Sequence, residues 1–221
     1  IDLAKAPKEA WQKPCVYRSM DGELRRGFRH ELASCLALFA VLRRYEPTHP
    51  ALIGPWVEAL ALINEGDIPM PVADRLEATN LEEQLLACTA AEFDLLAYLV
   101  LSHHGKVRVA LHASPKDQNY VAHDDRGMPI RGVRDGDTLP AISLDGERSL
   151  PVLLLTLAPA TLGLSPVTGR SWRDRTAALL RTYGPGALAF LEALLIAADR
   201  RASKLRTNDP LLARDSSGGA P

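Results

Sequence analysis

The sequence lacks a strong excess of charge of either sign. Its 221 residues include 26 Lys and Arg against 27 Asp and Glu, which gives a formal net charge of -1. This balance argues against a protein that holds nucleic acid mainly through a basic coat, although a local basic path is compatible with it. Long apolar runs are also missing, since the longest, Cys35 to Leu42, has eight residues. No membrane-spanning helix fits in that length, so we expect a cytoplasmic protein without a membrane partner.

Cysteines are few and show no paired spacing. There are three, Cys15, Cys35 and Cys88, and two of them lie in apolar stretches. We expect reduced thiols in the core of a cytoplasmic protein rather than disulfides or a cysteine metal site. The first residue is Ile1 instead of Met, and no signal peptide follows it, so we expect that the start of the domain is truncated.

Several catalytic motifs are absent as well. The sequence has no GxxxxGK[ST] motif, no GxGxxG after a strand, no GxSxG around a serine and no HExxH. These absences argue against a P-loop enzyme, a dinucleotide-binding fold, a hydrolase with a nucleophile elbow and a zincin-type metalloprotease.

Apolar residues at helical spacing account for most of what is present. They predict an all-α protein with helices at 28–44, 52–64, 81–104, 172–182 and 186–203. The first of these is apolar on every side, which is typical of a buried central helix. Gly105 suits the end of the third. We expect one domain over residues 1–208 and a disordered tail at 209–221.

One region departs from the helical pattern. Val107, Val109 and Leu111 alternate with more polar residues, which predicts a strand, and many Gly and Pro residues follow. We therefore expect a small insertion of short strands and turns at about 106–160.

Three of the six histidines occupy unusual positions. His30 is in the first turn of the apolar helix, and His103 and His104 are in the last turn of another. The simplest alternative to a metal site is that imidazolium groups complement the dipole at a helix C-terminus. Asp199 favours the metal site over the helix dipole as the explanation. Its position places a carboxylate on the apolar stripe of the last helix, where a buried acid requires a partner.

A bound cation would satisfy all four of these side chains. Imidazole and carboxylate ligands together suit Mg²⁺, Mn²⁺ or another first-row transition metal acting on phosphate. The remaining histidines, His49, His112 and His123, are expected to be solvated, with His123 notable for the two aspartates beside it.

Basic residues flank the proposed metal ligands. Arg25, Arg26 and Arg29 precede His30, and Lys106 and Arg108 follow the histidine pair. Ordinary surface charge is one explanation, and phosphate binding is the other. The sequence therefore leaves Arg29, Lys106 and Arg108 as candidate nucleic-acid-binding residues.

Five segments in order resemble a known family: RGFRHELAS (26–34), LSHHGKVR (101–108), GVRDGDTLPA (132–141), SWRDRTAALLRTYGP (171–185) and LAFLEALLIAADRRAS (188–203). They look like the HD nuclease domain of the CRISPR-associated helicase-nuclease of type I systems, in the branch where this domain follows the helicase. The resemblance implies an all-helical HD fold and metal-dependent cleavage of single-stranded DNA. It also implies partners, namely the helicase portion of the same polypeptide and a crRNA-guided surveillance complex.

The resemblance also implies roles for individual residues. His30, His103, His104 and Asp199 resemble the metal ligands of the family, and Lys106 and Arg108 resemble the basic residues after its histidine pair. His103, His104 and Lys106 are thus the expected catalytic residues, in a two-metal phosphodiester hydrolysis.

The sequence departs from the family at its front. The family has an early histidine and then a His-Asp pair, commonly within HDxGKA, whereas no histidine precedes His30. Residues 1–6 are either a degenerate version of that motif or the stretch that follows it, with the pair lying upstream. Two other functions therefore stay open: an HD phosphohydrolase acting on nucleotides, and a non-catalytic module that docks a helicase onto a surveillance complex.

Overall fold

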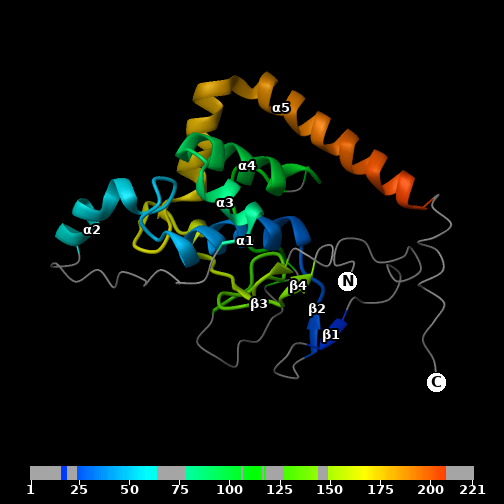
Figure 1. The fold of residues 1–221 in the computed structure, drawn as a ribbon, viewed down its shortest axis with the longest axis horizontal. Coiled ribbons are helices and arrows are strands. Elements are labelled where there is room, and N and C mark those ends of the chain that lie inside the picture. Colours follow the sequence, from blue (N-terminus) through cyan, green and yellow to red (C-terminus); the bar gives the residue numbers. More distant parts are fainter. Residues whose placement is uncertain are drawn as a thin grey trace.

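The computed structural model describes residues 16–18, 24–63, 78–105, 107–115, 117, 127–143 and 149–207. The described chain is mainly helical, with short two-residue and three-residue strands between the helices (Figure 1). The prediction of a predominantly helical protein is confirmed at this level. The limits of the expected domain, 1–208, and the tail at 209–221 stay predictions, and the tail lies outside the described residues.

Helix α1, His30–Tyr45, forms the centre of the core. Leu32, Leu36 and Phe39 are fully buried, as the apolar character of this segment on every side predicted. The ring of Phe39 meets that of Phe93 on α4 edge to face, with centroids 5.0 Å apart. Arg43 in the last turn places positive charge at the negative end of the helix dipole.

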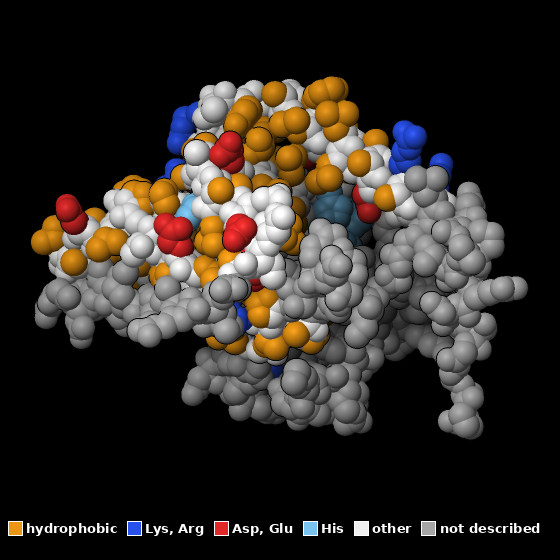
Figure 2. All heavy atoms as spheres, in the orientation of Figure 1, with side chains coloured by type: hydrophobic (Ala, Val, Ile, Leu, Met, Phe, Trp, Pro, Cys, Tyr) orange, Lys and Arg blue, Asp and Glu red, His pale blue; other side chains and the backbone are white. Residues whose placement is uncertain are grey.

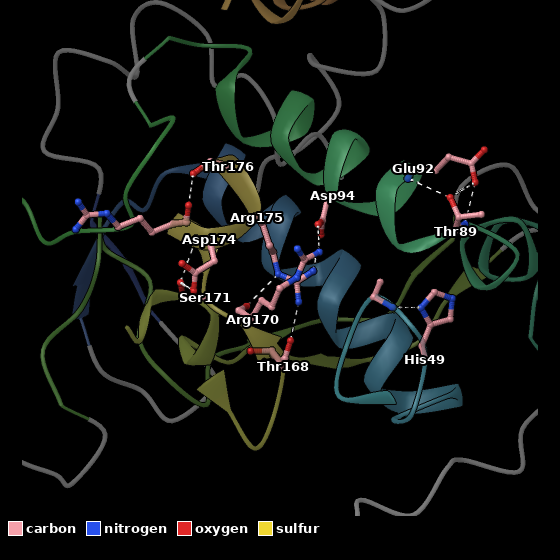
Figure 3. Close-up of polar contacts among 12 residues, drawn as sticks. His49, Thr89, Glu92, Asp94, Thr168, Arg170, Ser171, Asp174, Arg175 and Thr176 are labelled. Carbon is pink, nitrogen blue, oxygen red and sulfur yellow. Dashed lines mark hydrogen bonds and ion pairs between the residues drawn. The ribbon is translucent and has the colours of Figure 1, made fainter. Parts of the chain in front are cut away.

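The prediction of a single helix at 81–104 is wrong. The chain forms two helices there, α3, Asn80–Leu86, and α4, Ala90–Ser102, and their axes differ by 119°. Each begins with a capping box, in which a threonine and the glutamate three residues later satisfy each other's backbone N–H groups. The second box, made by Thr89 and Glu92, lies inside the expected helix and starts a new one (Figure 3).

The helix expected at 52–64 is shorter than predicted. A 3₁₀ turn, Gly54–Trp56, leads into α2, Val57–Ile63. Leu60 is buried, whereas Leu62 and Ile63 near the end of α2 are exposed.

The strands are short and form only pairs. In chain order, the antiparallel pairs are β1 (Val16–Arg18) with β2 (Leu24–Arg26), β3 (Thr138–Leu139) with β6 (Leu153–Leu154), β4 (Ile142–Ser143) with β5 (Ser149–Leu150), and β7 (Leu164–Ser165) with β8 (Gly169–Arg170). Four of these strands, β3 to β6, lie within the region where short strands and turns were expected.

The prediction of a strand around Val107 to Leu111 is also wrong. These residues have no regular structure and pair with no strand among the described residues. Val107 and Leu111 are buried, but the backbone bonds to side chains instead of a neighbouring strand. The carbonyl of Arg108, for example, accepts a hydrogen bond from the indole of Trp172 at 2.7 Å. Burial does not follow the two-residue period of a strand either, because Val109, between the buried Val107 and Leu111, is 49% exposed.

Helix α5, Trp172–Thr207, consists of two helical parts. Gly184 interrupts it with a φ of 73° and a ψ of 162°, a backbone conformation that favours glycine, and Pro185 follows. This break agrees with the two helices predicted at 172–182 and 186–203. Figure 1 shows the second part crossing above α4.

A buried ion-pair network joins α4 to the start of α5. Arg175 is buried and donates to the carboxylate of Asp94 and to the carbonyl of Thr168, and Arg170 donates to the same carboxylate at 2.8 Å (Figure 3). The guanidinium of Arg175 also lies over the ring of Phe39, 5.1 Å from its centroid. The network fixes β8, α4 and α5 relative to α1.

One described stretch, Trp172–Lys204, is long and apolar enough to cross a membrane by length and composition, with a mean hydropathy of 1.3 in its most apolar part. This stretch contains no long uninterrupted apolar run, because Arg181 and Glu192 lie within it. Glu192 is buried and accepts hydrogen bonds from Tyr98 and Arg108, which ties the stretch to α4 and the loop after it. The expectation of no membrane partner stays a prediction.

Candidate metal centre

Two helix ends meet at the candidate site. His30 is the first residue of α1, His103 follows the last residue of α4, and His104 comes next. Helices α1 and α4 pack against each other, and the Phe39–Phe93 contact lies further along α1 and further back along α4. The two helices are therefore antiparallel, which brings the start of one to the end of the other.

The three imidazoles form a compact cluster. Each offers a ring nitrogen, and these three nitrogens all lie within 4.8 Å of one another. Nε2 of His104 is 2.9 Å from Nε2 of His30, and the ring centroids of His103 and His104 are 4.1 Å apart. Figure 2 shows histidine side chains gathered at the surface below the second part of α5, with an acidic side chain beside them. The cluster is half-buried, so both a cation and a substrate could reach it.

The short contact between His30 and His104 suits a shared cation. Two ring nitrogens that face each other with both lone pairs repel, so they must share a proton or bind one positive ion. Without an ion, the 2.9 Å separation is that of an N–H···N hydrogen bond, in which one ring is the donor and the other the acceptor. It also places both Nε2 atoms where one cation could replace the shared proton.

A hydrogen bond to the backbone orients His103, and a carboxylate lies behind His30. Nδ1 of His103 is 2.6 Å from the carbonyl oxygen of Val100, so Nδ1 carries the proton and Nε2 keeps its lone pair. Nδ1 of His30 lies 3.6 Å from the carboxylate of Glu31, on the side opposite its contact with His104. A backbone carbonyl or a carboxylate behind a histidine is the usual arrangement around metal-binding imidazoles.

Burial favours the neutral, metal-binding form of two of these rings. Loss of solvent lowers the pKa of His30, and it also lowers the pKa of His104, where the two neighbouring imidazoles act in the same direction. A helix dipole would instead stabilise an imidazolium, so the lowered pKa of His104 favours the metal-binding form of that ring over a role in complementing the dipole.

Asp199 lies near the cluster, on the second part of α5. Its negative charge acts on both His30 and His104 and opposes the lowering of each pKa. The compact group of ligand atoms within 4.8 Å consists of the three histidines, so the carboxylate of Asp199 stands outside that group. Of the four predicted ligands, the structure therefore brings three into one cluster and places the fourth within electrostatic reach.

The predicted basic residues have different surroundings. Arg29 is partly exposed next to His30, and its Nη1 lies 3.7 Å from the carboxylate of Glu31. Arg108 forms a two-point ion pair with Glu192 at 2.8 and 2.9 Å, so its charge is already balanced inside the protein. Lys106 lies outside the described residues.

The histidines that were expected to be solvated differ from one another. His112 is exposed and accepts a hydrogen bond from Arg131 at 2.9 Å. His49 is buried, which contradicts the prediction, because both of its ring nitrogens bond to the backbone, Nδ1 to the N–H of Ala51 and Nε2 to the carbonyl of Leu86. His123 lies outside the described residues.

Sequence reasoning missed one residue of this site, Glu31. A glutamate in the first turn of a helix ordinarily faces solvent and complements the dipole, so its residue type alone does not indicate burial. The signal that could have found it is its neighbourhood, since it directly follows His30 in a segment that is otherwise apolar on every side.

In comparisons with known proteins, no family model, no curated protein and no solved structure matches the chain.

Proposed function

We propose that the chain is an HD-type nuclease domain that uses a divalent cation to hydrolyse phosphodiester bonds in single-stranded DNA. The observation that carries this proposal is the convergence of His30, His103 and His104 from the ends of two helices. The five segments that resemble the HD nuclease family support it, because two of them contain these histidines. Mg²⁺ or Mn²⁺, or another first-row transition metal, is the expected cofactor.

The histidines would hold the cation through Nε2, and Asp199 would supply negative charge that balances it. A bound divalent ion polarises a phosphoryl oxygen and lowers the pKa of an attacking water. The chain's own contribution is to orient His103 through its hydrogen bond to the carbonyl of Val100 and to place the negative charge of Glu31 3.6 Å from Nδ1 of His30. A two-metal reaction needs further ligands, and the early residues where the family has its His-Asp pair lie outside the described part of the chain.

Substrate binding is proposed to involve Arg29 and Lys106. Arg29 borders the cluster and is partly exposed, so it could neutralise a phosphate close to the metal. Arg108 is a weaker candidate than the sequence indicated, because Glu192 already holds its guanidinium. With little net charge of its own, the domain would depend on the helicase portion of the same polypeptide and on a crRNA-guided surveillance complex to deliver DNA.

The test is cleavage of circular single-stranded DNA in the presence of Mn²⁺. The double variant His103→Ala/His104→Ala should lose metal-dependent cleavage, whereas the His112→Ala variant, which alters an exposed histidine with no place in the cluster, should retain it. Full activity in the double variant would refute the assignment.

A panel of nucleotides, incubated in parallel, tests the other catalytic function that this ligand set allows. Consumption of nucleotides without cleavage of the circle would indicate a phosphohydrolase. If neither substrate is consumed although metal is bound, a non-catalytic docking module becomes the better explanation.

A further inference from the structure

Glu31 differs from the other buried carboxylates of the described chain. It is fully buried, with a relative exposure of 0%, yet neither of its carboxylate oxygens accepts a hydrogen bond from the described residues. The other buried acids accept hydrogen bonds or pair with arginine: Glu82, Asp94, Asp117 and Glu192.

This burial has a large energetic cost. Moving a carboxylate out of water costs several kcal/mol, roughly, unless positive charge or hydrogen-bond donors replace the solvent. Among the described residues, the positive or potentially positive groups beside it are Arg29 Nη1 at 3.7 Å and His30 Nδ1 at 3.6 Å. Both distances are too long for a hydrogen bond, so these two groups compensate the charge only in part.

The position of Glu31 relative to the cluster suggests what completes the compensation. Nδ1 of His30 lies 3.6 Å from the carboxylate of Glu31, and Nε2 of the same ring lies 2.9 Å from His104. The imidazole therefore lies between the carboxylate and the proposed cation site. The negative charge of Glu31 also acts on His104, which is the more distant ring. Three neutral imidazoles carry no charge, and Glu31 together with Asp199 would balance the two positive charges of a divalent ion.

We propose that Glu31 is a positioning residue of the metal centre. Its negative charge lies 3.6 Å from Nδ1 of His30 without a hydrogen bond, so it would act electrostatically: it would favour a proton on Nδ1, leave Nε2 to face the ion, and stabilise the bound cation through the imidazole. This inference rests on the proposed function, because it requires the histidine cluster to bind a divalent metal. The inference goes beyond the proposed function because it gives a role to a residue that would contact neither the metal nor the substrate.

The test compares the Mn²⁺ affinity of wild-type protein and the Glu31→Gln variant by isothermal titration calorimetry on the full chain. Loss of such a partner behind a metal-binding histidine costs about 10-fold to 100-fold in metal affinity, and we expect a decrease in that range. The Glu31→Asp variant keeps the charge and should recover part of the affinity. Glu82→Gln is the matched control, since it removes a buried carboxylate that accepts a hydrogen bond from Tyr45 at the other end of α1, and it should bind Mn²⁺ as the wild type does.

Thermal unfolding without metal separates a metal-centre role from a structural one. A buried charge without hydrogen bonds costs stability, so metal-free Glu31→Gln should unfold at the same temperature as wild type or higher. Unchanged Mn²⁺ affinity in Glu31→Gln would overturn the inference, and so would a metal-free Glu31→Gln protein that is unfolded or markedly less stable. A wild-type protein that binds no Mn²⁺ would instead refute the proposed function itself.

Discussion

The buried ion pair between Asp94 and Arg175 gives the most direct prediction about stability. Asp94 receives hydrogen bonds from Arg175 and Arg170, and the Arg175 guanidinium also bonds to the carbonyl of Thr168 at 2.7 Å (Figure 3). Asp94→Asn preserves the size of the side chain but removes the negative charge. The guanidinium of Arg175, only 1% exposed, would then be left as a buried cation without a counter-ion.

The expected loss of stability is large. Removing one partner of a buried ion pair costs about 3–5 kcal/mol. For a chain of this size each kcal/mol lowers Tm by about 2–4 °C, so Tm should fall by about 6–20 °C. The measurement is thermal unfolding followed by circular dichroism, with urea unfolding to give the free energy.

The matched control is Asp174→Asn, which removes an exposed carboxylate from the first turn of α5, the helix that carries Arg175, where it accepts a hydrogen bond from Ser171. It should cost less than about 1 kcal/mol. If Asp94→Asn is also within 1 kcal/mol of wild type, the network does not hold α4 to α5 as described, and the reasoning fails.

Two further predictions concern single residues elsewhere in the fold. Burial raises the pKa of the Cys35 thiol to about 12, so iodoacetamide should leave Cys35 unmodified in the native protein near neutral pH. After unfolding, the same reagent should modify it. Peptide mapping by mass spectrometry checks both results, and rapid labelling of the native protein would contradict the burial. Thr89→Ala should destabilise the protein by about 1 kcal/mol, because it removes the N-cap of α4, and urea unfolding should show the loss near neutral pH. Hydrogen bonds from Thr89 lower the pKa of the Glu92 carboxyl, so this part of the stability is present above the ordinary pKa of a glutamate and disappears as pH falls through the lowered value. A stability difference between Thr89→Ala and wild type that grew under acid conditions would contradict this sign.

The helices that the sequence predicted best are those whose local signals agree with their packing. The segment of α1 is mainly apolar and most of it is buried, with Ser34 exposed, and glycine and proline at 184–186 mark the break in α5. Two of the errors in secondary structure have local causes. A capping box within an apolar stretch ended one helix and began another at Thr89. The apolar residues at 107–111 alternate in sequence, but they lie in a loop in which Val107 and Leu111 are buried and Val109 is exposed.

The histidine cluster could be predicted because its members stand out against apolar surroundings. The same argument located Asp199, whose charge acts on the cluster although its carboxylate is outside the compact group of ligand atoms. The roles of Glu31 and Glu192 could not be predicted, since they depend on which groups tertiary packing brings to each carboxylate. Periodicity gives the face of a helix, but it does not give the partner across the interface.

The central claim is that His30, His103 and His104 bind one divalent cation in common. The most direct test is Mn²⁺ titration of the full chain by calorimetry, for the wild type and for the His103→Ala/His104→Ala variant. The cluster predicts saturable binding by the wild type and loss of that binding in the double variant, with circular dichroism showing that the variant keeps its helices. Equal Mn²⁺ binding by the two folded proteins would contradict it.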